Sequence, residues 1–286
     1  MGDKLKKFFQ VFGLVTLICF SFFYTEKVGY VVREMDTLME EIREKSENKK
    51  IEPINATIID NTIIPGKYGK EVDIEESYKK MKRINEYNEN MLVYKQIKPK
   101  ISIKNNYDKY IISGSKSEKN VSLVLLINDT TDINYLIDLA KEKKVKFNFF
   151  VDSTWFENNN NLLYTLINEG HNIGNLGQNG NYNTSTYIWM DTILKKIIKQ
   201  KNNYCYLENE NKQYLEICAL NKNYTIKPSL IINDSPTNNI QKNIQNGSII
   251  SISANNNITK ELSVTINYII NKGYKIVTLN DLLDER

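Results

Sequence analysis

The sequence predicts an α/β fold with a parallel sheet in its C-terminal half. Two apolar runs of strand length, residues 121–127 and 147–151, are each followed by a helical pattern, at residues 133–140 and 162–168. Strands that alternate with helices in this way form parallel sheets, because each helix returns the chain to the same edge. Further strands are expected at residues 248–252 and 275–279, around a helix at residues 261–271.

The composition fits a globular protein and gives no support to nucleic-acid binding. The chain has 286 residues, of which 41% are hydrophobic, which is enough for a sizeable core. Its net charge of +4 comes from 38 Lys and Arg against 34 Asp and Glu. The lysines are scattered rather than gathered into one basic stripe, so no nucleic-acid partner is expected.

The N-terminus predicts a membrane anchor. Residues 8–24 form an apolar run without charge, preceded by three lysines within residues 4–7. A bilayer-spanning helix needs roughly 17 to 25 residues, and the flanking lysines favour a cytoplasmic N-terminus. Residues 25–31 contain no small-x-small pattern, so an uncleaved signal anchor is expected rather than a cleaved signal peptide. The predicted location is the cell membrane, with a single span and an extracellular C-terminal domain.

A short helical stalk is expected directly after the anchor. Apolar residues recur there with helical spacing, at Val28, Val31, Met35, Leu38 and Ile42. This seam predicts a stalk that could self-associate, and the alternative is a helix that packs on its own domain. The expected division is 1–27 for the cytoplasmic tip and anchor, 28–50 for the stalk and linker, 51–117 for a small α+β segment, and 118–286 for the main domain.

Three cysteines are present. Cys19 lies inside the apolar run, where it behaves as a small hydrophobic residue. Two free cysteines are the expected state of Cys205 and Cys218. A bridge between them is the alternative, because sequence does not show whether their Cα atoms come within about 4.4 to 6.8 Å.

Five segments of the C-terminal half resemble the polysaccharide deacetylase, or NodB homology, domain in order and spacing, over about residues 118–286. These segments are Val121-Ser-Leu-Val-Leu-Leu-Ile-Asn-Asp129, Phe147-Asn-Phe-Phe-Val151, Glu169-Gly-His-Asn-Ile-Gly-Asn175, Gly247-Ser-Ile-Ile250 and Lys272-Gly-Tyr-Lys-Ile-Val-Thr-Leu279. The resemblance implies a distorted, incomplete (β/α) barrel. It also implies removal of acetyl groups from N-acetylated sugars of peptidoglycan, chitin or related polymers, by water activated on a divalent metal such as zinc.

The residues that carry this chemistry in the family are largely replaced here. The resemblance places the catalytic base at Asn128, an amide without useful basicity, and one metal-binding carboxylate at Asp129. The resemblance places the two histidine ligands at Leu176 and Gly180. It places the histidine that acts as general acid, late in the family's sequence, at Ser253. Leucine and glycine side chains cannot bind a metal, so no metal cofactor and no catalysis are expected.

The histidine count supports this interpretation without any alignment. The chain has one histidine, His171, and a single imidazole cannot supply a site of two histidines within one chain. His171 matches the motif histidine that precedes the ligands, and we expect it to be a packed turn residue. Residues 205–209, which correspond to the family's arginine-containing segment, lack the arginine.

Other candidate groups are weaker. Trp155 is a candidate for stacking against a sugar ring, with core packing as the alternative. Asp132 beside Asp129, and Asp152 beside Glu157, are carboxylate pairs of the kind used on glycosidic bonds, but we expect them to be solvated.

The leading functional hypothesis is a noncatalytic deacetylase-like domain outside the membrane that binds a cell-wall glycan or a partner protein. One alternative is an active hydrolase that removes N-acetyl groups with a rearranged metal site around Asp129. Another is a structural membrane protein that acts through the stalk at residues 28–42. The sequence leaves the oligomeric state open.

Overall fold

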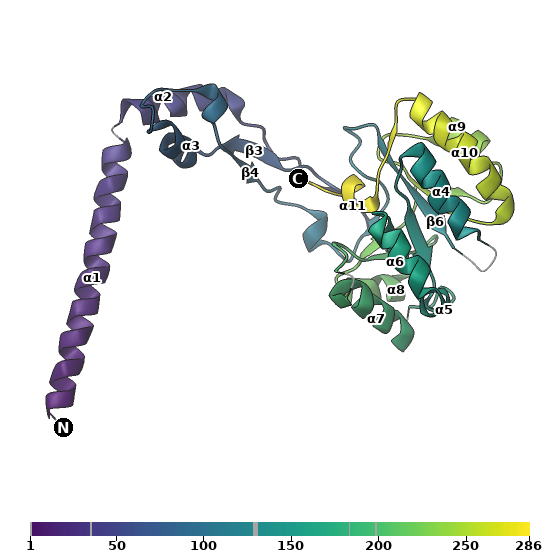
Figure 1. Ribbon diagram of the computed structural model, residues 1–286, viewed down its shortest axis with the longest axis horizontal. Helices are drawn as coiled ribbons and strands as arrows, with labels where there is room; N and C mark the ends of the chain where they lie inside the picture. Colours follow the sequence, from purple (N-terminus) through teal and green to yellow (C-terminus); the bar gives the residue numbers. More distant parts are fainter. Residues whose placement is uncertain (1, 35, 128–130, 183, 198) are drawn as a thin grey trace. The chain divides into compact units, whose positions relative to one another are not determined.

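The computed structural model describes residues 2–34, 36–127, 131–182, 184–197 and 199–286, and they form two compact units (Figure 1). The smaller unit contains residues Met1–Glu52 and Gly69–Ile97, and the larger one contains Pro53–Tyr68 and Lys98–Arg286. The predicted segment at 51–117 is therefore divided between the two units. Local sequence patterns did not indicate this, because the early strands of the larger unit pair with strands far along the chain.

Helix α1, Gly2–Glu34, contains the predicted anchor. Its segment Lys6–Thr25 is long and apolar enough to cross a membrane, and none of that window is buried against the rest of the protein. One N-terminal apolar helix of this kind is compatible with either a signal anchor or a signal peptide.

The rest of the smaller unit consists of a short antiparallel ladder and two helices. Its elements are α2 (Thr37–Ser46), β3 (Gly69–Val72), α3 (Ile74–Met81) and β4 (Tyr94–Ile97), with 3₁₀ turns at Glu47–Lys49 and Glu89–Met91. Leu38, Met39 and Ile42 of α2 pack with residues of the ladder and of α3, including Tyr78 and Met81.

The continuous stalk expected over residues 28–42 is wrong. Helix α1 ends at Glu34, and Asp36 has an extended backbone whose side chain accepts a hydrogen bond from Leu38 N at 3.0 Å. This N-cap begins a new helix at Thr37. Leu38 and Ile42 are fully or almost fully buried in their own unit. The alternative of a helix packed on its own domain is the one the structure supports for α2.

The larger unit is built on a long, open, mainly parallel sheet. Its order is β1-β2-β5-β10-β9-β8-β7-β6-β12-β11, with β13 beside β6, and only the β1–β2 pair of this sheet is antiparallel among the described residues. The strands are β1 (Thr57–Ile59), β2 (Thr62–Ile64), β5 (Tyr110–Ile111), β6 (Asn120–Leu126), β7 (Asn148–Val151), β8 (Asn172–Asn175), β9 (Tyr204–Tyr206), β10 (Tyr224–Ile226), β11 (Leu230–Ile232), β12 (Ile249–Ser253) and β13 (Lys275–Ile276). The α/β class and the incomplete barrel expected from the sequence are confirmed.

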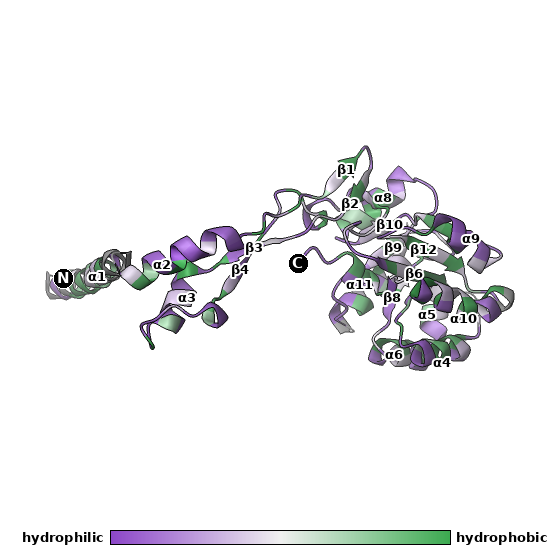
Figure 2. Cartoon of the chain, turned by 90° about the horizontal axis from the view of Figure 1, so that it is seen from above, coloured by the Kyte–Doolittle hydropathy of each residue, from purple (hydrophilic) through white to green (hydrophobic). Residues whose placement is uncertain are grey.

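Helices follow most of these strands and cover the outer side of the sheet (Figure 1). They are α4 (Ile133–Lys143), α5 (Ser153–Asn158), α6 (Asn160–Asn168), α7 (Ser185–Thr192) with a π-helical turn at Ile193–Ile197, α8 (Lys212–Leu220), α9 (Pro236–Asn243), α10 (Asn256–Asn271) and α11 (Leu279–Leu282). Helices α4, α6 and α10 each carry hydrophilic and hydrophobic residues, as expected of helices with one face on a core (Figure 2).

Both faces of the central strands are buried, which explains the continuous apolar runs in the sequence. Along β6, Leu123 and Leu125 belong to the core beneath the helices, whereas Val124 belongs to a second core on the other face. On β7, Phe149 and Phe150 divide between the two cores in the same way.

Side-chain amides join the amino ends of the central strands. Asn148, at the start of β7, donates to Ser122 Oγ and to Leu123 O, both at 2.8 Å. Its Oδ1 accepts from Leu279 N at 2.7 Å and from Asn172 Nδ2 at 3.1 Å. Helix α11 is thereby fixed under the barrel, at the end opposite to the carboxyl ends of the strands.

Candidate functional site

A pocket lies at the carboxyl ends of β8 and β9, the edge of a parallel sheet at which binding sites usually form. It has a volume of about 390 Å³. Its lining residues are Leu176, Gly180, Tyr182, Tyr206, Leu207, Glu208, Asn209, Glu210, Asn211 and Tyr214. All of them belong to the larger unit.

The two positions predicted to have lost metal-binding histidines both line this pocket. Leu176 directly follows β8 and is partly buried. It packs against the second core, which contains Val124 and Phe150. Gly180 has a φ of +78° in a turn closed by hydrogen bonds of 2.9 Å between the backbones of Gln178 and Asn181. A Cβ at Gly180 would meet no atom within 4 Å, so this side of the pocket is open.

The residues present do not fit the metal of the deacetylases. Leu176 and Gly180 offer no side-chain donor atom at the two positions where the sequence resemblance places histidines. Within the described ranges, no group of three or more His, Cys, Asp or Glu side chains is arranged to hold a metal ion. The predicted base position Asn128 and the surviving carboxylate Asp129 lie outside the described residues.

Ser253 is the last residue of β12, where the resemblance places the late histidine. Its hydroxyl lies 3.3 Å from Asn233 Oδ1. A serine hydroxyl does not titrate near neutral pH, so it cannot take the role of an imidazole as general acid.

His171 is a packed structural residue at the amino end of β8, away from the pocket. Its Nδ1 accepts a hydrogen bond from Phe147 N at 3.0 Å, and its ring packs against the rings of Phe147 and Phe149. Burial, with the nearby charge of Lys146, lowers the pKa of His171 to about 4. The imidazole is therefore neutral at physiological pH, which agrees with the sequence interpretation.

Trp155 is buried, with 7% of its surface exposed, and belongs to the core beneath the helices. Its ring face is not available to a sugar, so the alternative of core packing replaces the stacking hypothesis. The neighbouring carboxylates cap helices: Asp152 accepts from Trp155 N at 2.7 Å, and Asp132 accepts from Tyr135 N at 3.0 Å. These hydrogen bonds give both aspartates a structural role.

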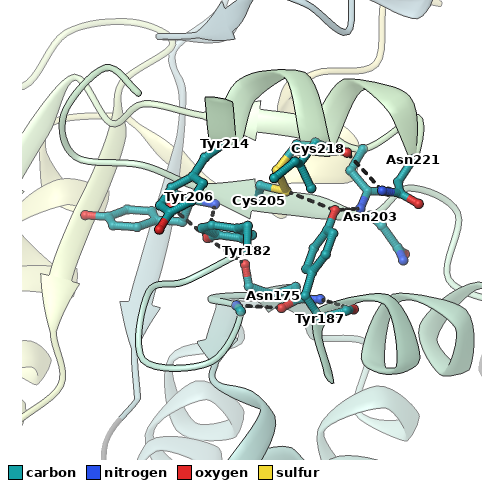
Figure 3. Close-up of a disulfide and its surroundings, with 12 residues drawn as sticks. Asn175, Tyr182, Tyr187, Asn203, Cys205, Tyr206, Tyr214, Cys218 and Asn221 are labelled. Atoms are coloured by element: carbon teal, nitrogen blue, oxygen red, sulfur yellow. Dashed lines mark hydrogen bonds between the residues drawn. A yellow bond between two sulfur atoms is a disulfide. The ribbon is translucent and has the colours of Figure 1, made fainter. Parts of the chain in front are cut away.

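Tyr182, Tyr206 and Tyr214, which line the pocket, lie close to Tyr187 in a cluster of tyrosines (Figure 3). The Tyr182 hydroxyl accepts from Tyr206 N at 3.0 Å and lies 2.8 Å from Tyr206 O and 3.0 Å from Asn175 O. Strands β8 and β9 pair only at Asn175 and Cys205, so this hydroxyl joins the two strands where they separate. Sequence reasoning missed Tyr182, because no periodicity or motif distinguishes it from the other tyrosines.

A disulfide between Cys205 of β9 and Cys218 of α8 lies beside these tyrosines (Figure 3). The two Cα atoms are 6.4 Å apart, and both residues are fully buried. The expectation of two free cysteines is wrong, because α8 folds back over β9 and brings residues 13 positions apart into bonding range. The bridge joins positions on either side of residues 207–214 and so restrains this segment, which supplies most of the pocket lining.

The pocket can bind a polar ligand, but no pair of nucleophile and base is found among the described residues that line it. Burial raises the pKa of the Tyr206 hydroxyl, which therefore stays protonated, 2.7 Å from Ser251 Oγ and 3.3 Å from Glu208 Oε1. The lining offers hydroxyls, amides, carboxylates and aromatic rings. This set suits recognition by hydrogen bonds and ring packing better than activation of water.

No family model matches the chain. It is 28% identical over 277 residues to the uncharacterized protein YlxY of Bacillus subtilis, an alignment that covers 89% of this chain and 86% of YlxY.

Solved structures share the fold. Wild-type BA3943 from Bacillus anthracis, described as a CE4 family pseudoenzyme, is 20% identical with a TM-score of 0.65, covering 88% of this chain and 96% of BA3943. A mutant of BA3943 with restored enzymatic activity has the same TM-score and is 21% identical, covering 87% of this chain and 99% of the mutant. A family 4 carbohydrate esterase from Bacillus anthracis is 23% identical with a TM-score of 0.52, covering 61% of this chain and 87% of the esterase. The chain therefore has the fold of the family 4 carbohydrate esterases, the polysaccharide deacetylases that its sequence motifs resemble.

Proposed function

We propose that this protein is anchored in the cell membrane by α1 and binds a cell-wall glycan outside the cell, without deacetylating it. The observation that carries the proposal is the pocket at the ends of β8 and β9. It is open and lined by tyrosines, and it contains Leu176 and Gly180, which the sequence resemblance places at the positions of metal ligands. A pocket that has lost its catalytic groups but remains open is suited to binding.

The location outside the cell is supported by two independent features. Lysines precede the apolar segment of α1, which favours a cytoplasmic N-terminus. The buried disulfide between Cys205 and Cys218 is of a kind that persists in oxidising compartments and is rare in the cytoplasm. Both features favour an extracellular position for the larger unit.

The loss of catalysis is supported by the residues themselves and by similarity to BA3943. BA3943 is described as a pseudoenzyme, and a mutant of it has restored enzymatic activity. That description shows that this fold persists in a protein without catalysis. In the present chain, the donor atoms missing at Leu176 and Gly180 give a direct chemical reason for the same loss.

The proposal is tested with the full-length chain in lipid nanodiscs. We expect co-sedimentation with purified peptidoglycan, and no release of acetate from N-acetylated chito-oligosaccharides with or without added zinc. Tyr214→Ala removes an aromatic wall of the pocket and is expected to weaken sedimentation. The matched control is Tyr164→Ala, which removes an exposed tyrosine of α6 outside the pocket and should change nothing.

Two results would contradict the proposal. Failure to bind peptidoglycan would exclude the glycan function, and acetate release that a chelator abolishes would favour the alternative of an active hydrolase. Loss of that release in an Asp129→Ala variant would assign the activity to the surviving carboxylate position.

A further inference from the structure

The pocket at the ends of β8 and β9 has an unbalanced charge. Its charged lining residues are Glu208 and Glu210, and no Lys, Arg or His is found among the described residues that line it. Glu210 forms an ion pair with Lys227, with Oε1 and Nζ 2.6 Å apart. Glu208 forms no ion pair within the described part of the chain, and its carboxylate accepts from the Tyr206 hydroxyl at 3.3 Å. One carboxylate therefore remains uncompensated.

The position of Glu208 makes this charge available to a ligand. Glu208 is exposed, two residues after the end of β9, while the neighbouring residue Tyr206 is 7% exposed. The Tyr206 hydroxyl is 2.7 Å from Ser251 Oγ. The hydroxyl thus has a second partner and does not neutralise the carboxylate. A carboxylate only accepts hydrogen bonds, so it selects ligand groups that donate them.

The walls of the pocket suit the ring of a sugar. Tyr214 is partly buried, and its ring centroid lies 5.5 Å from that of Tyr182, so the two rings support each other. Leu176 and Leu207 add apolar surface to the lining. Aromatic and aliphatic surfaces pack against the apolar face of a pyranose, and polar groups at the rim then select its substituents.

An amino sugar can present either an acetamido group or a free amine. An ammonium group donates three hydrogen bonds and carries a positive charge. An acetamido group is neutral, donates one hydrogen bond from its N–H, and presents a carbonyl oxygen that a carboxylate repels. With Leu176 and Gly180 at the former ligand positions, neither of these side chains can act on that carbonyl. The chemistry of the lining favours the amine.

We propose that the pocket selects glycans that carry free amino groups, with Glu208 as the acceptor for the ammonium group and Tyr214 as a wall for the sugar ring. This inference rests on the proposed glycan-binding function and specifies its ligand as a deacetylated polymer. The protein is then a reader of deacetylated glycan on the scaffold of an enzyme that produces it.

The test compares two oligosaccharides of equal length with the full-length chain in nanodiscs. The probes are the fully deacetylated glucosamine hexamer and the fully N-acetylated hexamer, with binding measured by calorimetry. An exposed ion pair favours binding by up to about fivefold, so we expect the deacetylated probe to bind more tightly by up to that factor. The chain's net charge of +4 does not by itself attract a cationic oligosaccharide, so a preference reflects the local site.

Two glutamine variants locate the preference. Glu208→Gln keeps the size of the side chain and removes its charge, and we expect the two probes to bind this variant equally. Glu216→Gln is the control: Glu216 is an exposed residue of α8 that does not line the pocket, and its variant should keep the preference.

The possible outcomes separate this inference from the proposed function. Equal binding of both probes by the wild-type chain, or tighter binding of the N-acetylated probe, overturns the inference and leaves the glycan-binding function standing. A preference that survives in Glu208→Gln also overturns it. Binding of neither probe, together with failure to bind peptidoglycan, overturns both.

Discussion

Removal of the disulfide should destabilise the larger unit by a calculable amount. The bridge between Cys205 and Cys218 closes a loop with a sequence separation of 13. Closing a loop of about 14 residues lowers the entropy of the unfolded chain by an amount worth about 3 kcal/mol at room temperature. Both cysteines are fully buried, and the Tyr187 hydroxyl next to Cys205 Sγ keeps its hydrogen bond from Asn223 Nδ2 when the sulfur is removed. We expect the Cys205→Ala, Cys218→Ala double variant to lose about 3 kcal/mol of unfolding free energy.

The assay is urea unfolding of the full-length chain in detergent, followed by near-ultraviolet circular dichroism. Tyr187, whose hydroxyl lies 3.4 Å from Cys205 Sγ, reports on the surroundings of the bridge. The wild-type protein treated with a reductant should behave like the double variant, and Cys19→Ala should behave like the untreated wild type. A loss below about 1 kcal/mol, with the bridge shown to be present by mass spectrometry, would refute the loop-entropy argument.

The remaining predictions concern the barrel and its degenerate site. Asn148→Ala should cost about 3 kcal/mol in urea unfolding, because it leaves Leu279 N and other buried partners unsatisfied, while the exposed control Asn243→Ala should cost less than about 0.5 kcal/mol. The folded-state pKa of His171 is about 4 against 6.5 when unfolded, so the unfolded chain takes up the proton first as the pH falls. The free energy of unfolding should therefore decrease by about 3 kcal/mol as the pH falls from about 6.5 to 4. This decrease should be smaller in His171→Gln. Equal pH profiles of the variant and the wild type would contradict the burial argument. A quadruple variant combines Asn128→Asp, Leu176→His, Gly180→His and Ser253→His. It should bind zinc in calorimetry where the wild type does not, with a backbone penalty of about 1 kcal/mol at Gly180, and absence of binding would show that the ligand positions are misassigned.

The sequence predicted the central architecture because that information is local. Residues 121–127 and 147–151 are apolar at all positions except Ser122 and Asn148. The structure explains this by two cores, one on each face of β6 and β7. The helix over α4 was likewise recognised from the spacing of its apolar residues. Strands β8 to β11, which are three or four residues long, were not identified as strands from periodicity.

The chemistry of the degenerate site also came from the sequence. One histidine in the whole chain rules out a site of two histidines, whatever the fold. The tertiary structure added where those positions lie: Leu176 and Gly180 line one pocket, together with Glu208 and Tyr214, which no motif had indicated.

Several features depended on residues that are distant in the sequence. Asp36 caps α2 and ends the expected stalk, and α2 buries its apolar residues against β3 and α3, more than 30 positions later. The sequence showed an amphipathic seam and could not show which surface would cover it.

By itself, then, the sequence determined the apolar N-terminal helix, the α/β class and the absence of a histidine metal site, because composition and short-range periodicity carry that information. Only the tertiary structure decided the disulfide, the division into two units, the burial of Trp155 and the acidic pocket. Each of these depends on which distant segments meet. Strand pairing and helix packing determine these long-range contacts, and the local sequence pattern does not encode them.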